Sequence, residues 1–176
     1  MRTALIRVTL AASLASFASL ALGAACTKAT PVGPSAPPSA APERPPGTSG
    51  FPGLDWGANA DDVTGVYPGA QPGAPGLTWA GPVLGEPAHV AFTMDGDGLQ
   101  QVTIAFDAGY ASMETCGETL HRLRPQLDAR LGAGSEDNLG VFWDTPTASV
   151  VLACNPTDDD SGRAELTSTF QRRAAE

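Results

Sequence analysis

Apolar residues recur along the second half of the chain at two different spacings. Between residues 112 and 131 they return every three or four positions, and this period predicts an amphipathic helix that buries Cys116, Leu120, Leu123, Leu127 and Leu131. Elsewhere apolar and polar residues alternate, which is typical of strands with one buried face. The alternation predicts strands over residues 77–80, 88–94, 99–107, 139–143, 147–154 and 163–172.

Capping and turn residues separate these segments. Asn59 followed by Asp62 is the pattern of a helix N-cap, so a short helix is expected over residues 60–67, and a Pro-Gly pair ends it. The Asp-Gly-Asp-Gly segment at 95–98 predicts a hairpin turn, because these residues accept the positive φ of such turns. Pro125 lies inside the longer helix, where the loss of a backbone hydrogen bond predicts a kink or a break.

The predicted elements follow the same order twice, a helix and then three strands. Shifting the chain by 64 residues places Trp79 on Trp143 and Phe106 on Phe170, which favours a tandem repeat. We therefore expect an α+β, two-layer fold with one antiparallel sheet of about six strands and both helices on one face.

The N-terminal region has the composition of an export signal. Arg2 and Arg7 precede an uncharged run over residues 8–25 that ends in small residues, which predicts a signal peptide over residues 1–25. A retained membrane anchor is the alternative, because the 18 residues of this run reach the lower limit for a membrane span. The small residues at its end favour cleavage.

Residues 26–50 form a second region, rich in Pro, Ala and Ser and almost without large apolar side chains. Such a segment cannot bury enough apolar surface to fold, so it is expected to be a disordered tether that is partly polyproline II. Residues 51–176 are left as an acidic α+β domain.

The segment from Leu22 to Cys26, Leu-Gly-Ala-Ala-Cys, resembles the lipobox of bacterial lipoproteins, in which a signal peptidase cuts before a Cys that then carries diacylglycerol. That family usually has Leu three positions before the Cys, where this chain has Gly23. The resemblance implies an exported protein held by lipid on Cys26 at the cell envelope, at the outer membrane facing the periplasm or the cell surface. The alternative is ordinary cleavage after an Ala, which leaves Cys26 as a free thiol.

The other two cysteines, Cys116 and Cys154, are expected to face one core. Cys116 lies on the apolar stripe of the longer helix, and Cys154 has the strand parity of Val150 and Leu152. Because disulfides persist in exported proteins, these positions predict a Cys116–Cys154 bridge. A catalytic or redox cysteine is the alternative, but no second Cys stands at Cys-x-x-Cys spacing.

Charge and motifs narrow the classes of function. The chain has 10 Lys and Arg against 19 Asp and Glu, a formal net charge of -9, which argues against a nucleic-acid partner. His89 and His121 stand alone, the segment at 95–98 lacks the later ligands of a calcium loop, and the motifs of a nucleophile elbow and a phosphate-binding loop are absent from the sequence. We therefore expect no catalytic residue, no metal and no cofactor.

The three tryptophans, Trp56, Trp79 and Trp143, are candidate binding aromatics, because aromatic side chains supply much of the energy at protein interfaces. The alternative is packing in the core, since a small two-layer domain needs large side chains between helix and sheet.

The folded part resembles the helix-then-strands module of the small outer-membrane assembly lipoproteins of the SmpA/OmlA type and, in tandem, secreted β-lactamase inhibitor proteins. The residues that carry the resemblance are Trp56-Gly57, Val63, Trp79, the Asp97-Gly98 turn and Phe106. Together with the tether, it implies a non-enzymatic, lipid-anchored envelope protein that binds another protein near the membrane. The alternatives are a small secreted enzyme whose carboxylates meet only in the folded protein, and an inhibitor of a secreted enzyme.

Overall fold

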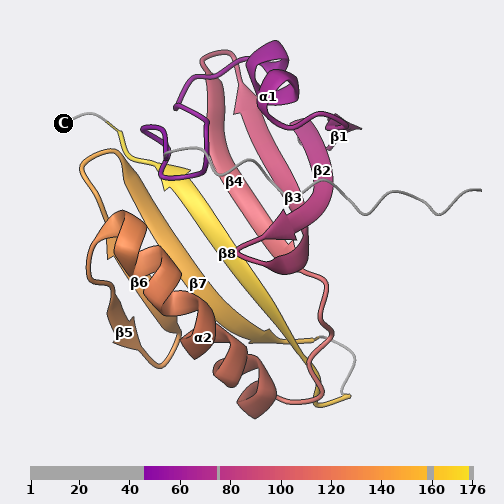
Figure 1. Cartoon of the computed structure of the whole chain (residues 1–176), viewed down its shortest axis with the longest axis vertical. Helices are drawn as coiled ribbons and strands as arrows, with labels where there is room; N and C mark the ends of the chain where they lie inside the picture. The colour runs from indigo at the N-terminus through magenta and orange to yellow at the C-terminus, as the bar shows by residue number, and fades with distance from the viewer. Residues whose placement is uncertain (1–45, 75, 158–160, 175–176) are drawn as a thin grey trace, which may run out of the picture. The chain divides into compact units, whose positions relative to one another are not determined.

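The computed structural model describes residues 46–74, 76–157 and 161–174. Two helices and eight strands make up this part of the chain, and all eight strands join one antiparallel sheet in the order β1-β2-β3-β4-β8-β7-β6-β5 (Figure 1). The helices are α1 (Ala60–Val66) and α2 (Met113–Leu131), and the strands are β1 (Gln71–Gly73), β2 (Gly76–Val83), β3 (Glu86–Asp95), β4 (Gly98–Phe106), β5 (Ser135–Asp137), β6 (Gly140–Asp144), β7 (Ala148–Pro156) and β8 (Ala164–Arg172).

The predicted two-layer fold with about six strands is wrong, because the sheet has eight strands. The additional strands, β1 and β5, form its two edges and are three residues long, with the sequences Gln-Pro-Gly and Ser-Glu-Asp. All six residues are exposed, so neither strand carries the alternation that marks a buried face. Each half of the sheet is therefore a helix followed by four strands, and the predicted repeat of three strands is corrected to four.

The two halves meet where β4 pairs with β8, with Thr103 opposite Thr169. On one side of this pair the strands follow in the order β3, β2, β1, and on the other side in the equivalent order β7, β6, β5. The two halves of the sheet are therefore related by an approximate twofold rotation. Trp79 and Trp143 are equivalent, since they lie opposite Val90 and Val150. The shift of 64 residues does not hold in the later strands. Ile104 of β4 lies opposite Val90, and Phe170 of β8 lies opposite Val150, so the residue equivalent to Phe170 is Ile104 and not Phe106.

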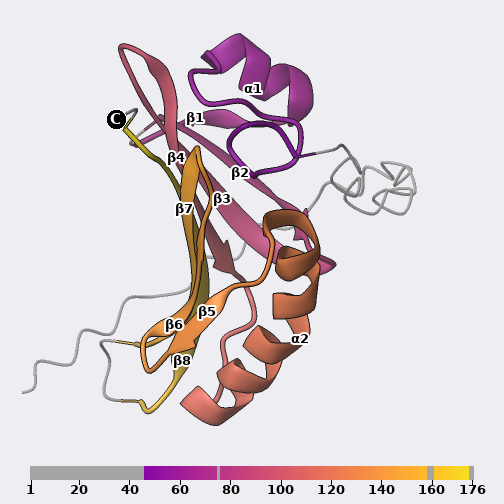
Figure 2. The ribbon, with the colours of Figure 1, turned by 90° about the vertical axis from the view of Figure 1, so that its left-hand side faces the viewer.

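The core lies between the sheet and the helices, and Figure 2 shows α1 and α2 on the same side of the sheet. Helix α2 begins at the N-cap Ser112, whose hydroxyl accepts the N–H of Thr115, and it runs through Pro125 as one helix, without the predicted break. Neither helix in the described part of the chain is long and apolar enough to span a membrane. The side chains that α2 buries are Cys116, Leu120, Leu123 and Leu127.

The segment before α1 is also packed into the fold. The buried ring of Phe51 contacts Phe92 of β3 and Phe170 of β8, so it joins the two halves. Ser49 is fully buried, and its hydroxyl donates to the Leu54 carbonyl at 2.6 Å. Packed structure therefore reaches into the range that the sequence assigns to the tether. The predicted signal peptide and the lipidation site Cys26 lie outside the described residues.

The predicted disulfide is present: Cys116 of α2 is bonded to Cys154 of β7, with an S–S distance of 2.01 Å. Cys116 is fully buried and Cys154 is partly buried against the core. The bridge fixes the N-terminal part of α2 to the strand that it covers.

Candidate binding face of the sheet

The face of the sheet opposite the helices, here called the open face, is covered by no helix or strand of the described residues (Figure 2). Strand pairing defines a row of side chains that crosses this face through all eight strands. None of these side chains is charged, and in the six strands between the two edge strands they alternate with core residues. From β1 to β5 the row consists of Gln71, Thr78, Ala91, Thr103, Thr169, Val151, Phe142 and Ser135.

The composition of this row suits contact with another macromolecule. Threonine and valine favour extended backbone, so the strands keep their geometry without burying these side chains. The hydroxyl and amide groups donate and accept hydrogen bonds, and the apolar side chains of Val151 and Phe142 add contact area. A partner that covers this row removes no charge from water, which keeps the desolvation cost low.

Two charged pairs lie at opposite ends of the open face, next to the ends of the central strands β4 and β8; they are here called the first corner and the second corner. At the first corner, His89 Nε2 lies 3.3 Å from Asp107 Oδ1, with exposed side-chain fractions of 70% and 41%. At the second corner, Arg173 lies 3.7 Å from the carboxylate of Asp144. The approximate twofold relation makes Asp107 equivalent to Arg173: the N–H of Asp107 donates to the Pro87 carbonyl, and that of Arg173 to the equivalent Thr147 carbonyl.

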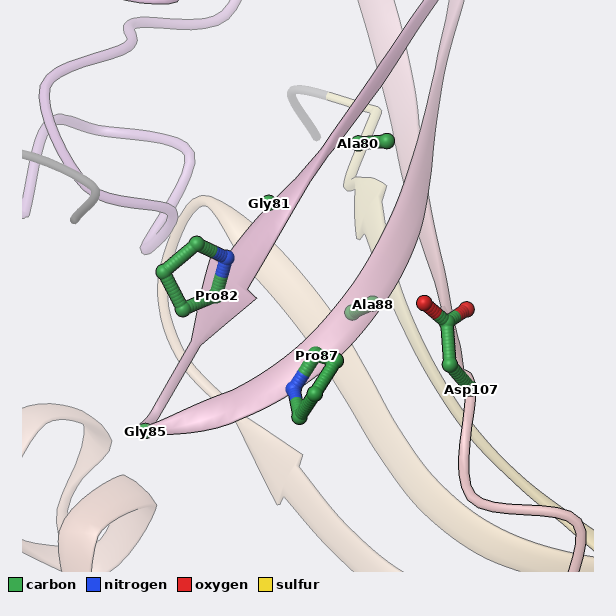
Figure 3. Close-up of a pocket in the computed structure, with 7 residues that line it drawn as sticks. All are labelled: Ala80, Gly81, Pro82, Gly85, Pro87, Ala88 and Asp107. Carbon is green, nitrogen blue, oxygen red and sulfur yellow. The ribbon is translucent and has the colours of Figure 1, made fainter. Parts of the chain in front are cut away.

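Two pockets adjoin the first corner. One has a volume of about 310 Å³, and Figure 3 shows it framed by the proline rings of the β2–β3 hairpin and by the Asp107 side chain; its lining consists of Ala80, Gly81, Pro82, Gly85, Pro87, Ala88 and Asp107. The other has a volume of about 250 Å³ and is lined by Gly69, Gln71, Thr78, Trp79, Ala80 and His89. Ala80 belongs to both pockets.

The tryptophans do not form a common groove on the open face. Trp79 and Trp143 have the parity of core residues and are buried on the helix side of the sheet. The Trp79 ring meets Tyr67 edge-on, and the Trp143 indole N–H donates to Asp128 at 2.8 Å. Trp56 is partly buried against the core, and its indole N–H has no hydrogen-bond partner within the described ranges.

Asp128 connects α2 to the second half of the sheet. It accepts the backbone N–H of Gly134 at 2.9 Å and the Trp143 indole N–H, and Arg124 lies 3.5 Å away. The Gly134 hydrogen bond, followed by those from Trp143 and Arg124, lowers the pKa of the Asp128 carboxyl below its ordinary value. These contacts are on the helix side, so Asp128 has a structural role.

The residues considered for metal binding are dispersed. His89 contacts Asp107, and His121 lies exposed on α2. Within the described residues, no three His, Cys, Asp or Glu side chains are grouped so that they could hold a metal ion. The three consecutive aspartates Asp158, Asp159 and Asp160 lie outside the described residues.

The hairpin turn between β2 and β3, at the first corner, could not be predicted from the sequence. Leu84 and Gly85 both have positive φ, 53° and 83°, which makes them a two-residue hairpin turn that sets Pro82 opposite Pro87. Leucine is uncommon at such a position, so the turn has no typical Asn-Gly or Asp-Gly signature.

No protein-family model, curated protein or solved structure matches this chain. The resemblances noted in the sequence therefore stay predictions.

Proposed function

We propose that this chain is a non-enzymatic, lipid-anchored protein of the bacterial cell envelope that binds another protein through the open face of its sheet. The observation that carries the proposal is the uncovered face of eight strands with an uncharged central row. In this proposal the lipid on Cys26 and the following tether keep the face near the outer membrane.

The size of the open face supports a protein partner rather than a small ligand. Neighbouring strands lie about 4.8 Å apart and each residue extends a strand by about 3.3 Å, so the eight strands, which differ in length from three to ten residues, together span about 900 Å². A standard protein interface buries about 800 Å² on each partner. The face is therefore large enough for one such interface.

The lipid anchor supports a partner at the membrane. Each buried methylene of an acyl chain adds about 0.8 kcal/mol of membrane affinity, so two or three chains on Cys26 hold a protein firmly on one leaflet. A segment rich in proline extends by about 3.1 Å per residue where it adopts polyproline II. The tether then lets the domain reach a partner tens of ångströms from the bilayer.

Photo-crosslinking from the open face tests the proposal. A photoreactive residue replaces Thr169, at the centre of the uncharged row, in the full chain expressed in its own envelope, and the matched control places it at Ala129, exposed on α2. We expect a discrete protein adduct from position 169 and none from position 129. A second substitution, Thr103→Arg, should remove the adduct because it places a charge in the middle of the interface. Equal adducts from both positions, or none from position 169, would contradict the proposal.

The anchor is tested separately by a Cys26→Ser substitution and membrane fractionation. Loss of the protein from the membrane fraction is expected, because serine cannot take the thioether-linked lipid. Unchanged fractionation would refute lipidation at Cys26.

A further inference from the structure

The larger pocket at the first corner is lined by hydrocarbon groups and one carboxylate. Ala80, Pro82 and Pro87 have open-face parity and present only hydrocarbon side chains, and Figure 3 shows the two proline rings on one side of the pocket and Asp107 on the other. Asp107 is the only lining residue with a charged side chain. The pocket therefore fits a group that has an apolar stem and a cationic end.

Asp107 has the capacity to bind such a cationic end. Its carboxylate is 41% exposed and has one contact in the described structure, with His89. A carboxylate offers about four lone-pair positions, so one neighbour leaves most of them to water or to a ligand. A guanidinium approaches a carboxylate with two parallel N–H donors, which gives a stronger bond than a single contact.

The size of the pocket fits a side chain. Its volume of about 310 Å³ lies at the lower limit of ligand pockets, which range from about 300 to about 1,000 Å³. The pocket is also open to the face that the proposed partner covers, so the group that enters it belongs to that partner.

The charge around the pocket favours a basic partner. Residues 51–176 hold 6 Arg against 18 Asp and Glu, so their formal balance is 6 - 18 = -12. On the open face, strand parity also places two carboxylates, those of Asp137 and Glu165, and one guanidinium, that of Arg163, at the end of the sheet where Asp107 lies, so negative charge remains in excess there. Complementary charge speeds association and selects partners, so an arginine-bearing surface fits this end of the face.

We propose that the pocket binds an arginine side chain of the partner protein, with its guanidinium on Asp107 and its methylene stem against Pro82 and Pro87. The assignment rests on the proposed function, because the arginine belongs to the protein that covers the open face. Arginine fits better than lysine, since its planar and weakly hydrated head pairs with a carboxylate through two donors.

An NMR titration of the full lipid-anchored chain in detergent micelles tests this assignment. The probe is N-acetyl-arginine amide, and N-acetyl-norleucine amide serves as the neutral probe of similar length. We expect saturable shifts of the backbone amides of Ala80, Ala88 and Asp107 with the arginine probe only. Asp107→Asn should weaken the affinity at least tenfold, whereas the matched variant Glu118→Gln, at an exposed position of α2 on the other side of the sheet, leaves it within twofold of the parent.

One further variant, together with the crosslinking result, distinguishes failure of the pocket assignment from failure of the proposed function. His89→Gln should keep or raise the affinity, because it removes the group that shares the carboxylate. Absence of saturable shifts, equal shifts with both probes, or unchanged affinity in Asp107→Asn would overturn the assignment. If the arginine probe binds but Thr169 gives no crosslinked adduct, the pocket binds arginine, but the proposed function fails and with it the origin of the arginine in a partner on the open face. If Thr169 gives an adduct but the probe does not bind, only the pocket assignment is overturned.

Discussion

The disulfide between Cys116 and Cys154 offers the most quantitative test of the fold. The two residues are 38 positions apart, so the bridge closes a long loop in the unfolded chain. In the chain-entropy model, a loop of this length contributes about 3.9 kcal/mol to the free energy of unfolding. The double variant Cys116→Ala/Cys154→Ala should lose this amount, together with about 1 kcal/mol for the small cavity left at the fully buried Cys116.

The loss converts into a large shift of the thermal midpoint. At about 2.1 cal/mol/K of unfolding entropy per residue, about 130 packed residues give a decrease of about 14 °C for the loop term alone. The midpoint is measured by circular dichroism on the full chain, and reversibility is checked by a second scan.

Reduction of the parent protein is the matched control, because it opens the loop and keeps both sulfur atoms. The reduced parent and the double variant should agree within about 1 kcal/mol. The reasoning is wrong if the double variant loses less than about 1 kcal/mol, or if both thiols of the untreated protein react with an alkylating reagent.

Three further substitutions test other parts of the structure. Asp128→Asn should cost about 1 kcal/mol at pH 7, measured by urea unfolding. Because hydrogen bonds in the folded state lower the pKa of the Asp128 carboxyl, this stability is present above the ordinary pKa of an aspartate, about 4, and is lost as the pH falls through the lowered pKa. The difference between parent and variant should therefore shrink as the pH falls below about 4, and a difference that stays constant would contradict this account. Phe51→Ala removes the ring that joins the two halves and should cost about 3–5 kcal/mol, measured in the same way; a loss below about 1 kcal/mol would contradict that role. Gly98→Ala should lower the free energy of unfolding by about 2 kcal/mol, because φ is 87° and the new Cβ would meet the Gly57 carbonyl. The control Gly96→Ala has no neighbouring atom within 4 Å and should stay within about 0.5 kcal/mol of the parent. Equal effects of the two substitutions would refute this account.

The long elements could be predicted from the sequence because each has a buried face. The expected helix over residues 112–131 corresponds to α2, Met113–Leu131, and the expected strand over residues 99–107 corresponds to β4, Gly98–Phe106. Burial forces apolar residues into a regular period there, and the period is visible in a single sequence. The edge strands β1 and β5 have no buried face, so their pairing depends on neighbours that the sequence pattern does not identify.

The candidate site was harder to predict than the fold. Strand parity already separates Thr103 and Thr169 from the core, but their position side by side depends on the pairing of β4 with β8, which are far apart in the sequence. The first corner likewise requires His89 of β3 to meet Asp107 after β4. Isolated polar residues have no periodic signal, so only the folded sheet brings them together.

The charged side chains at the two corners of the open face are not needed for the folding of the sheet. Asp107 and Arg173 occupy equivalent positions, and both donate their backbone N–H to the equivalent carbonyl of a neighbouring strand. Since the backbone makes the same bond at both places, a carboxylate at one corner and a guanidinium at the other are not imposed by the fold. A partner turned by the approximate twofold relation would meet the same arrangement of strands. Its arginine would then face Arg173, whose guanidinium already lies against the Asp144 carboxylate, instead of Asp107. Repulsion between like charges disfavours that orientation, so the unequal corners give a nearly symmetric face one preferred direction of docking.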